Sequence, residues 1–253
     1  MVKLIAFDMD GTLLRCGGLV SGYTLKVLSK CKERGILLAM VTARSNGSAQ
    51  SYIDAIKPDI IITNGGATGY YKGCMVYERM MSPINCKNLT KLAIGDDGVD
   101  YIRFVSLGGC FSNEPDYTRP HWYKYTDFSD FVISSACKIS LQAKAPLFIE
   151  PYQDISPMND IAAFSGKLIY KISHKEALKK LALASIAQEC GIDLSSEAVA
   201  FGDDVLDIGM LSAVMHSVAV DNALASVKAV AAHICESNDN DGVAKYIDEF
   251  VLL

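Results

Sequence analysis

The sequence lacks the spacings that mark the common metal and redox motifs. Its eight cysteines are scattered singly without a C-x-x-C pair, and its four histidines show no H-x-x-x-H spacing. Structural zinc sites use such pairs, so we expect free thiols in a reducing compartment. Apolar runs of about 18 residues, which a membrane-spanning helix needs, are also missing. These absences argue against a zinc protein, a disulfide-rich secreted protein and a membrane protein.

The sequence has no excess of positive charge either. It has 24 lysine and arginine residues against 29 aspartate and glutamate residues, a net charge of −5. A chain of this charge has no general attraction for nucleic acid or for an anionic membrane surface. The N-terminus carries one lysine and then an acidic motif, so we expect no signal peptide. We therefore expect a cytoplasmic protein without nucleic-acid or membrane partners. Its oligomeric state is not indicated.

The 253 residues are half hydrophobic, which is typical of a packed globular protein. Short apolar runs without period-2 alternation, as in strands buried on both faces of a parallel sheet, alternate with segments of helical spacing. The predicted strands are residues 4–7, 36–41, 59–63, 198–201, 217–220 and 233–235; the predicted helices include 23–34, 49–56, 208–211, 224–231 and a segment ending at Gly191. This order predicts an α/β fold with a Rossmann-like, doubly wound parallel sheet.

The pattern is interrupted between residues 82 and 172. This segment has more Asn, Asp, Pro and Tyr, and residues 114–127 look like a Pro-interrupted loop. Strands are expected at 101–107, 138–142, 161–164 and 168–172, and a helix at 88–94. Because the parallel pattern resumes afterwards, we predict an inserted α+β domain at 82–172. The core domain would then be discontinuous, formed by residues 1–81 and 173–253.

Two aspartates follow the first predicted strand in the stretch KLIAFDMDGTLL. Asp8 and Asp10 stand two residues apart where open α/β sheets bind their ligands, and Gly11 lets the backbone turn. A plain strand-to-turn junction with solvated carboxylates is the alternative. Burying two like charges is unfavourable unless a cation or a proton separates them. The stretch therefore favours a metal site.

Polar residues also follow the other predicted parallel strands. Parallel strands end at one edge of a sheet, so these residues should converge there. They are Asp8 and Asp10, Thr42, Asn64, Asp203 with Asp207, and Asn222.

These residues, in this order, resemble motifs of the haloacid dehalogenase (HAD) superfamily, and more narrowly its Cof-type, subfamily IIB members with a C2 cap domain. The resemblance rests on D-x-D-G-T-L-L, V-T-x-R, N-G-G, A-F-G-D-x-x-x-D, N-A-x-x-x-V-K-A and D-G-V-A-K, over roughly residues 1–70 and 173–253. The inserted segment resembles the family's cap only in position and size.

The resemblance implies roles for the acidic residues. Asp8 would be the nucleophile that forms an aspartyl-phosphate, and Asp10 the general acid and base. Mg²⁺ would be held by the Asp8 carboxylate, the Asp10 backbone carbonyl and Asp203, while Asp207 orients that shell or joins it.

It also implies a phosphate site. Thr42, Ala43 and Asn222 would hold phosphoryl oxygens, and a lysine would offset their charge. Family register favours Lys179 for that lysine, and Lys175 is the alternative. Arg44 is a candidate substrate-binding residue or one half of a surface ion pair.

Three positions depart from the family pattern. Leu206 stands where the family usually has Asn, which removes a polar contact near the metal. Ala43 and Asp221 each replace a usual Gly. None of these departures removes the nucleophile, the acid/base or a principal metal carboxylate.

Together these features predict a Mg²⁺-dependent phosphatase, a phosphoric monoester hydrolase, acting on a small phosphorylated metabolite, most readily a sugar phosphate. Two alternatives remain: a phosphotransferase or mutase with the same nucleophile, and a non-catalytic module that binds phosphorylated metabolites.

Overall fold

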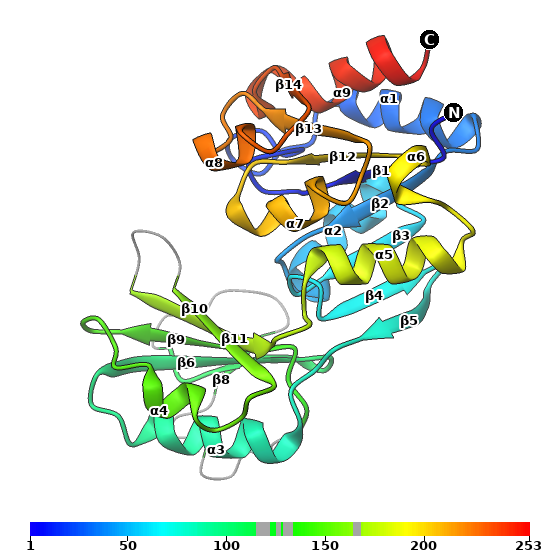
Figure 1. The fold of residues 1–253 in the computed structure, drawn as a ribbon. Coiled ribbons are helices and arrows are strands. Elements are labelled where there is room, and N and C mark those ends of the chain that lie inside the picture. The colour runs from blue at the N-terminus through cyan, green and yellow to red at the C-terminus, as the bar shows by residue number, and fades with distance from the viewer. Residues whose placement is uncertain (115–121, 125–127, 129–133, 164–167) are drawn as a thin grey trace. The chain divides into compact units, whose positions relative to one another are not determined.

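The structure, a computed structural model, describes residues 1–114, 122–124, 128, 134–163 and 168–253 (Figure 1). They form two compact units, one of residues 1–44, 49–78 and 178–253 and one of residues 45–48 and 79–177. Apart from residues 45–48, the boundaries between the units fall at 78/79 and 177/178, near the boundaries predicted from the sequence. The assignment of these units as core and cap domains stays a prediction. None of the helices formed by these residues has the length and apolarity that crossing a membrane requires.

The first unit is built on a sheet in which the described residues form eight strands. In sheet order they are β14 (His233–Cys235), β13 (His216–Val220), β12 (Ala198–Gly202), β1 (Leu4–Phe7), β2 (Leu37–Val41), β3 (Ile60–Thr63), β4 (Thr68–Tyr71) and β5 (Cys74–Glu78). Pairing is parallel from β14 to β3 and antiparallel from β3 to β5. The α/β fold with a parallel sheet core is confirmed.

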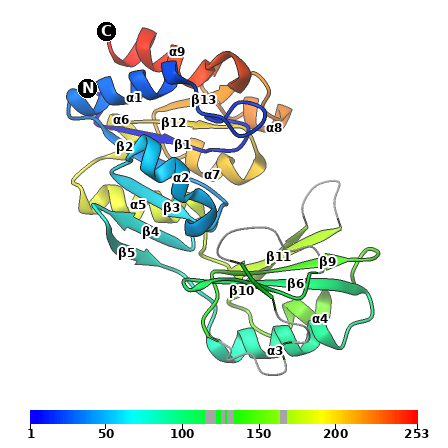
Figure 2. The same ribbon diagram turned by 180° about the vertical axis from the view of Figure 1, so that it is seen from behind.

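Helices cover both faces of this sheet, which explains why β1 and β12 are buried along their whole lengths. Figure 1 shows α5 and α7 on one face, and Figure 2, seen from behind, shows α1 and α2 on the other. The helices of this unit are α1 (Gly22–Glu33), α2 (Asn46–Ile56, in this unit from Ala49 on), α5 (Lys179–Glu189), α6 (Leu194–Glu197), α7 (Ile208–Leu211), α8 (Ala225–Lys228) and α9 (Gly242–Tyr246), with two short 3₁₀-helices, η1 (Val205–Asp207) and η2 (Asn238–Asn240), and a π-helix, η3 (Ile247–Val251).

The second unit has a sheet of its own, to which the described residues contribute six strands. In sheet order they are β10 (Asn159–Ala163), β11 (Ile169–His174), β9 (Lys138–Ala143), β6 (Val99–Ser106), β7 (Gly109–Ser112) and β8 (Trp122–Lys124), and the helices are α3 (Pro83–Ile94) and α4 (Glu150–Gln153). Its buried side chains form a cluster separate from that of the first unit. Of the predicted loop at 114–127, residues 115–121 and 125–127 lie outside the described residues, as does residue 164 of a predicted strand.

Several features differ from the prediction: β7, β8, α4 and α6 were not predicted, and β8 lies inside the predicted loop at 114–127. The β4–β5 hairpin was not predicted; its turn, Lys72-Gly73, has positive φ at both residues, as a two-residue hairpin turn requires. The sequence signal for this hairpin was the Lys72-Gly73 pair between two segments that contain tyrosine. The helix predicted at 224–231 is shorter, because α8 spans Ala225–Lys228.

Candidate active site

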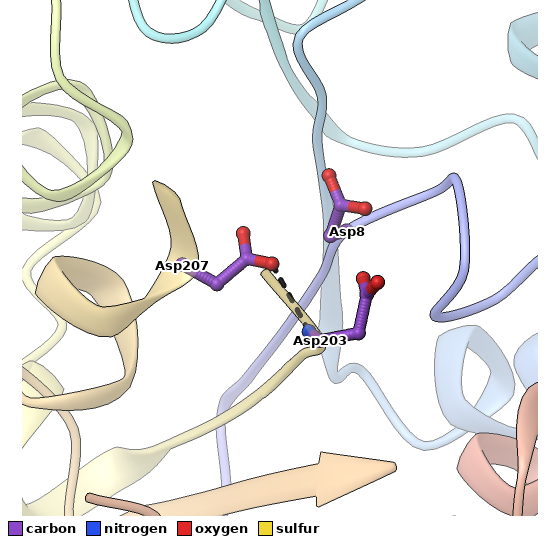
Figure 3. A group of neighbouring side chains, drawn as sticks. All are labelled: Asp8, Asp203 and Asp207. Carbon is purple, nitrogen blue, oxygen red and sulfur yellow. Dashed lines mark hydrogen bonds between the residues drawn. The ribbon is translucent and has the colours of Figure 1, made fainter. Parts of the chain in front are cut away.

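The predicted acidic residues meet at the carboxyl edge of the parallel sheet. Asp8 follows β1 directly, and Asp203 follows β12, the strand that pairs with β1. Asp207 ends the short turn η1, four residues further on. Each of the three side chains offers one carboxylate oxygen, and these oxygens all lie within 4.8 Å of one another. Figure 3 shows the three side chains grouped together.

Lys179 joins this group as a buried cation. Its ammonium donates hydrogen bonds to Oδ1 of Asp8 and, at 2.7 Å, to Oδ1 of Asp207. All three side chains are almost completely buried, with exposures of 4%, 9% and 0% for Lys179, Asp8 and Asp207. The structure thus brings Lys179 to Asp8, whereas Lys175, the alternative, is exposed and belongs to the second unit.

The packing of Gly66 explains how Lys179 reaches this place. Lys179 is the first residue of α5, and the backbone of Leu178 and Lys179 lies directly against Gly66. A Cβ at Gly66 would overlap the carbonyl group of Leu178 and would come within 2.6 Å of the Lys179 nitrogen. The N-G-G segment after β3 therefore provides the space for the start of α5.

The turn η1 fixes Asp207 and Asp203 relative to each other. Oδ2 of Asp207 accepts hydrogen bonds from the backbone N–H groups of Asp203 and Asp204, both at 3.1 Å, and Asp204 with Asp207 forms a capping box. Asp203 is held from the other side by the Thr12 hydroxyl, which donates to its Oδ1 at 2.6 Å. The G-D-x-x-x-D sequence thus orients the Asp207 carboxylate through its own backbone, whereas the Asp203 carboxylate is oriented by Thr12 of the D-x-D-G-T motif.

Burial changes the proton affinities of these groups. It raises the pKa of the Asp8 carboxyl to about 7, against the opposing effect of Lys179, and it raises the pKa of Asp203 to about 6. Burial alone would lower the pKa of the Lys179 ammonium, but the carboxylates of Asp8 and Asp207 raise it above its ordinary value. Lys179 is therefore a permanent cation, and one cation faces three acids.

This donor set fits a divalent cation of the Mg²⁺ kind. Such ions take carboxylate and carbonyl oxygens, and they relieve repulsion between clustered carboxylates. Asp207 already accepts three hydrogen bonds, from Lys179 and two backbone N–H groups, whereas Asp203 accepts one side-chain bond, from Thr12. The residues best able to hold the ion directly are therefore Asp8 and Asp203.

The Asp10 side chain lies apart from this group of three acids. Both its oxygens accept hydrogen bonds from the Arg44 guanidinium, from Nε at 2.7 Å and from Nη2 at 2.6 Å. The Asp10 side chain is 55% exposed and the Arg44 side chain 28% exposed. Of the two interpretations of Arg44, the structure shows the ion pair, and its partner is the predicted acid/base.

The predicted phosphate-binding residues differ in burial and in hydrogen bonding. Thr42 follows β2 and is fully buried, and its hydroxyl oxygen accepts the N–H of Arg44 at 3.1 Å. Ala43, next to it, is only half-buried. Asn222 follows β13, and its side chain donates to the Gly11 carbonyl at 2.7 Å and accepts from the Asn238 N–H at 2.9 Å. Asn222 thus braces the first motif, and phosphate binding by these three residues stays a prediction.

A set of contacts that the sequence did not predict fastens the loop after the D-x-D-G-T-L-L motif. Asp241, with φ of 56°, accepts two hydrogen bonds from Arg15, at 2.9 and 2.5 Å. The Asn238 side chain donates to the Leu14 carbonyl at 2.7 Å. These partners are more than 220 residues apart, so no local pattern could reveal them. The D-G-V-A-K motif was the one available signal.

Comparison with known proteins agrees with this geometry. The sequence model of the haloacid dehalogenase-like hydrolase family matches residues 5–247. The 5-amino-6-(5-phospho-D-ribitylamino)uracil phosphatase YcsE of Bacillus subtilis is 27% identical over 99% of this chain and 96% of its own length. The HMP-PP phosphatase of Klebsiella pneumoniae is 27% identical over 92% and 89%.

The fold is shared with solved structures of the same kind. The HAD subclass IIB sugar phosphatase BT4131 superposes with a TM-score of 0.81 over all of both chains, at 21% identity. The match of the family model along nearly the whole chain, the phosphatase relatives and this shared fold lead to one conclusion. The chain belongs to the haloacid dehalogenase-like hydrolases, is of their Cof type, and is a phosphatase.

Proposed function

We propose that this protein is a Mg²⁺-dependent phosphatase that hydrolyses a small phosphorylated metabolite, in particular a sugar phosphate, through an aspartyl-phosphate on Asp8. The observation that carries the proposal is the position of Asp8, buried at the end of β1 between the Lys179 ammonium and the Asp203 carboxylate. The named activities of YcsE and BT4131, both on small phosphorylated compounds, support this class of substrate.

In the first step, an Asp8 oxygen forms a bond to phosphorus while the bond from phosphorus to the ester oxygen breaks. Asp10 gives its proton to the departing alcohol. In the second step, Asp10 takes a proton from water, the water oxygen attacks the aspartyl-phosphate, and inorganic phosphate and the Asp8 carboxylate are released. Asp10 ends protonated, as it began; each of its oxygens accepts one hydrogen bond from Arg44 and keeps a second lone pair that can carry this proton.

The neighbouring residues stabilise charge and orientation in both steps. Lys179 offsets the charge of Asp8 and of the phosphoryl group, and the Thr42 hydroxyl, which accepts from Arg44, keeps its hydrogen to donate to a phosphoryl oxygen. Asp8 and Asp203, with the Asp10 backbone carbonyl, would hold Mg²⁺, and Asp207 would orient Lys179. The bound ion would neutralise phosphoryl charge and lower the repulsion between Asp8 and the incoming phosphate.

The test is phosphate release from p-nitrophenyl phosphate and a panel of sugar phosphates, with Mg²⁺ and with EDTA. We expect Mg²⁺-dependent release that falls by at least about 10³-fold in Asp8→Asn, since no nucleophile remains. Asp54→Asn, which alters an exposed carboxylate on α2, is the control and should keep full activity. Mass spectrometry of the quenched enzyme should detect one phosphoryl group in wild type.

Two results would contradict the proposal. Full activity in folded Asp8→Asn would exclude this nucleophile. Phosphate transfer to an added sugar, with little release to water, would replace the hydrolase by a phosphotransferase.

A further inference from the structure

The ion pair between Arg44 and Asp10 links two of the sequence motifs. It joins the predicted acid/base to the residue that ends the V-T-x-R motif, 34 residues away in sequence. The contact has two parallel hydrogen bonds, the fork arrangement that fixes the plane of a carboxylate as well as its position. One guanidinium therefore determines the orientation of Asp10.

Stability does not account for this contact. With Asp10 55% and Arg44 28% exposed, the charges are screened by water, and exposed pairs contribute about 0–1 kcal/mol. The contact instead supplies direction: its two hydrogen bonds set the plane of the Asp10 carboxylate, provided that Arg44 itself is held rigidly.

Arg44 is held at both its backbone and its side chain. Its N–H donates to the Thr42 hydroxyl at 3.1 Å, and its carbonyl accepts the Asn64 N–H at 2.7 Å. The guanidinium carbon lies 4.9 Å from the centre of the Tyr52 ring, whose hydroxyl donates to the Gly18 carbonyl at 2.9 Å. Stacking on an aromatic face restrains a guanidinium further.

We propose that Arg44 is a positioning residue that holds the Asp10 carboxylate in the orientation from which it exchanges its proton with the leaving group and with water. The inference rests on the proposed function and concerns how the acid/base is presented. Arg44 does not touch the phosphoryl group in this role, which separates it from the substrate-binding role considered from the sequence.

The test uses the need of different leaving groups for a proton. A p-nitrophenolate leaves without one, whereas a sugar alkoxide must be protonated. We expect Arg44→Met to lower kcat/KM for glucose 6-phosphate by about 10- to 100-fold, part of the contribution of general acid catalysis, and to lower that for p-nitrophenyl phosphate less than about threefold. Arg44→Lys should behave like Arg44→Met, because lysine keeps the charge but lacks the fork.

Two further variants sharpen the result. In Asp10→Asn, adding Arg44→Met should cause no further loss with glucose 6-phosphate, since both changes act on one function. Arg15→Met is the matched control: it also removes a two-point Arg–Asp contact, with Asp241, and should leave the ratio of the two kcat/KM values unchanged.

The outcomes separate the two proposals. If wild type hydrolyses neither ester, the proposed function fails, and the positioning role with it. If wild type hydrolyses both and Arg44→Met lowers both kcat/KM values equally, the positioning role alone fails and Arg44 binds the phosphoryl group. A raised inhibition constant for inorganic phosphate in Arg44→Met would point to the same correction.

Discussion

At the scale of single residues, charge balance organises the site. Lys179 lies between the buried carboxylates of Asp8 and Asp207, and the three side chains are almost completely shielded from water. Buried charges of this kind are stable as a set, and removing one member leaves the others without compensation. The same dependence underlies the raised pKa of Asp8, which burial and the nearby acids produce together.

Replacing Lys179 by methionine should therefore destabilise the fold. We expect the free energy of unfolding, measured by urea denaturation without divalent cations, to fall by about 3–5 kcal/mol. Lys180→Met, the matched control on the exposed side of the same helix, should change it by less than about 0.5 kcal/mol. Equal stability of the two variants would show that Lys179 is not needed to balance the buried acids.

At the scale of elements, close backbone approach sets the positions of the charged side chains. The start of α5 rests on Gly66, and η1 lies against Gly202, where an added Cβ would come within 2.5 Å of the Asp207 Cβ. Glycine is required in such places because any side chain would push the neighbouring element away. The loops that contain Gly66 and Gly202 therefore help to position Lys179 and Asp207.

Gly66→Ala tests this packing against Gly73→Ala. Both glycines have positive φ, 100° and 81°, so backbone strain alone should lower the free energy of unfolding by roughly 1–2 kcal/mol in each variant. A Cβ at Gly73 meets open space, whereas one at Gly66 collides with Leu178. Because Lys179 would be displaced, we expect kcat to fall at least about tenfold in Gly66→Ala alone. Loss of kcat to the same extent in both variants would contradict the positioning of α5 by Gly66.

At the scale of the whole molecule, the described residues form two units with separate hydrophobic clusters, and the group of buried acids lies in the first unit. The acids that could hold a cation, together with Lys179, all belong to the first unit. Ligands that bind the folded state but not the unfolded chain stabilise the folded state. Metal binding should therefore increase the free energy of unfolding.

Mg²⁺ is accordingly expected to raise the melting temperature. At about 100 times its dissociation constant it should add about 2.7 kcal/mol to the free energy of unfolding. Asp203→Asn should fold but lose this gain, and sodium chloride at equal ionic strength serves as the control for screening. An unchanged response in Asp203→Asn would place the ion elsewhere.

Much of this molecule follows from its sequence. The parallel sheet could be predicted because its strands are continuous apolar runs, and the site edge because polar residues follow those runs in a fixed order. The three acids Asp8, Asp203 and Asp207 lie close together in the structure. The catalytic, metal-binding and phosphate-binding roles assigned to these and the other site residues stay predictions.

What the tertiary structure alone decided is the pairing of side chains distant in sequence. Contacts across the sheet edge decide which lysine reaches Asp8, and they pair Asp10 with Arg44. They also place Asn222 between Gly11 and Asn238, with a hydrogen bond to each. Periodicity records which face of an element is buried, and motifs record which residue types are present. Neither contains the distances between atoms on different strands, which arise when the whole sheet is packed.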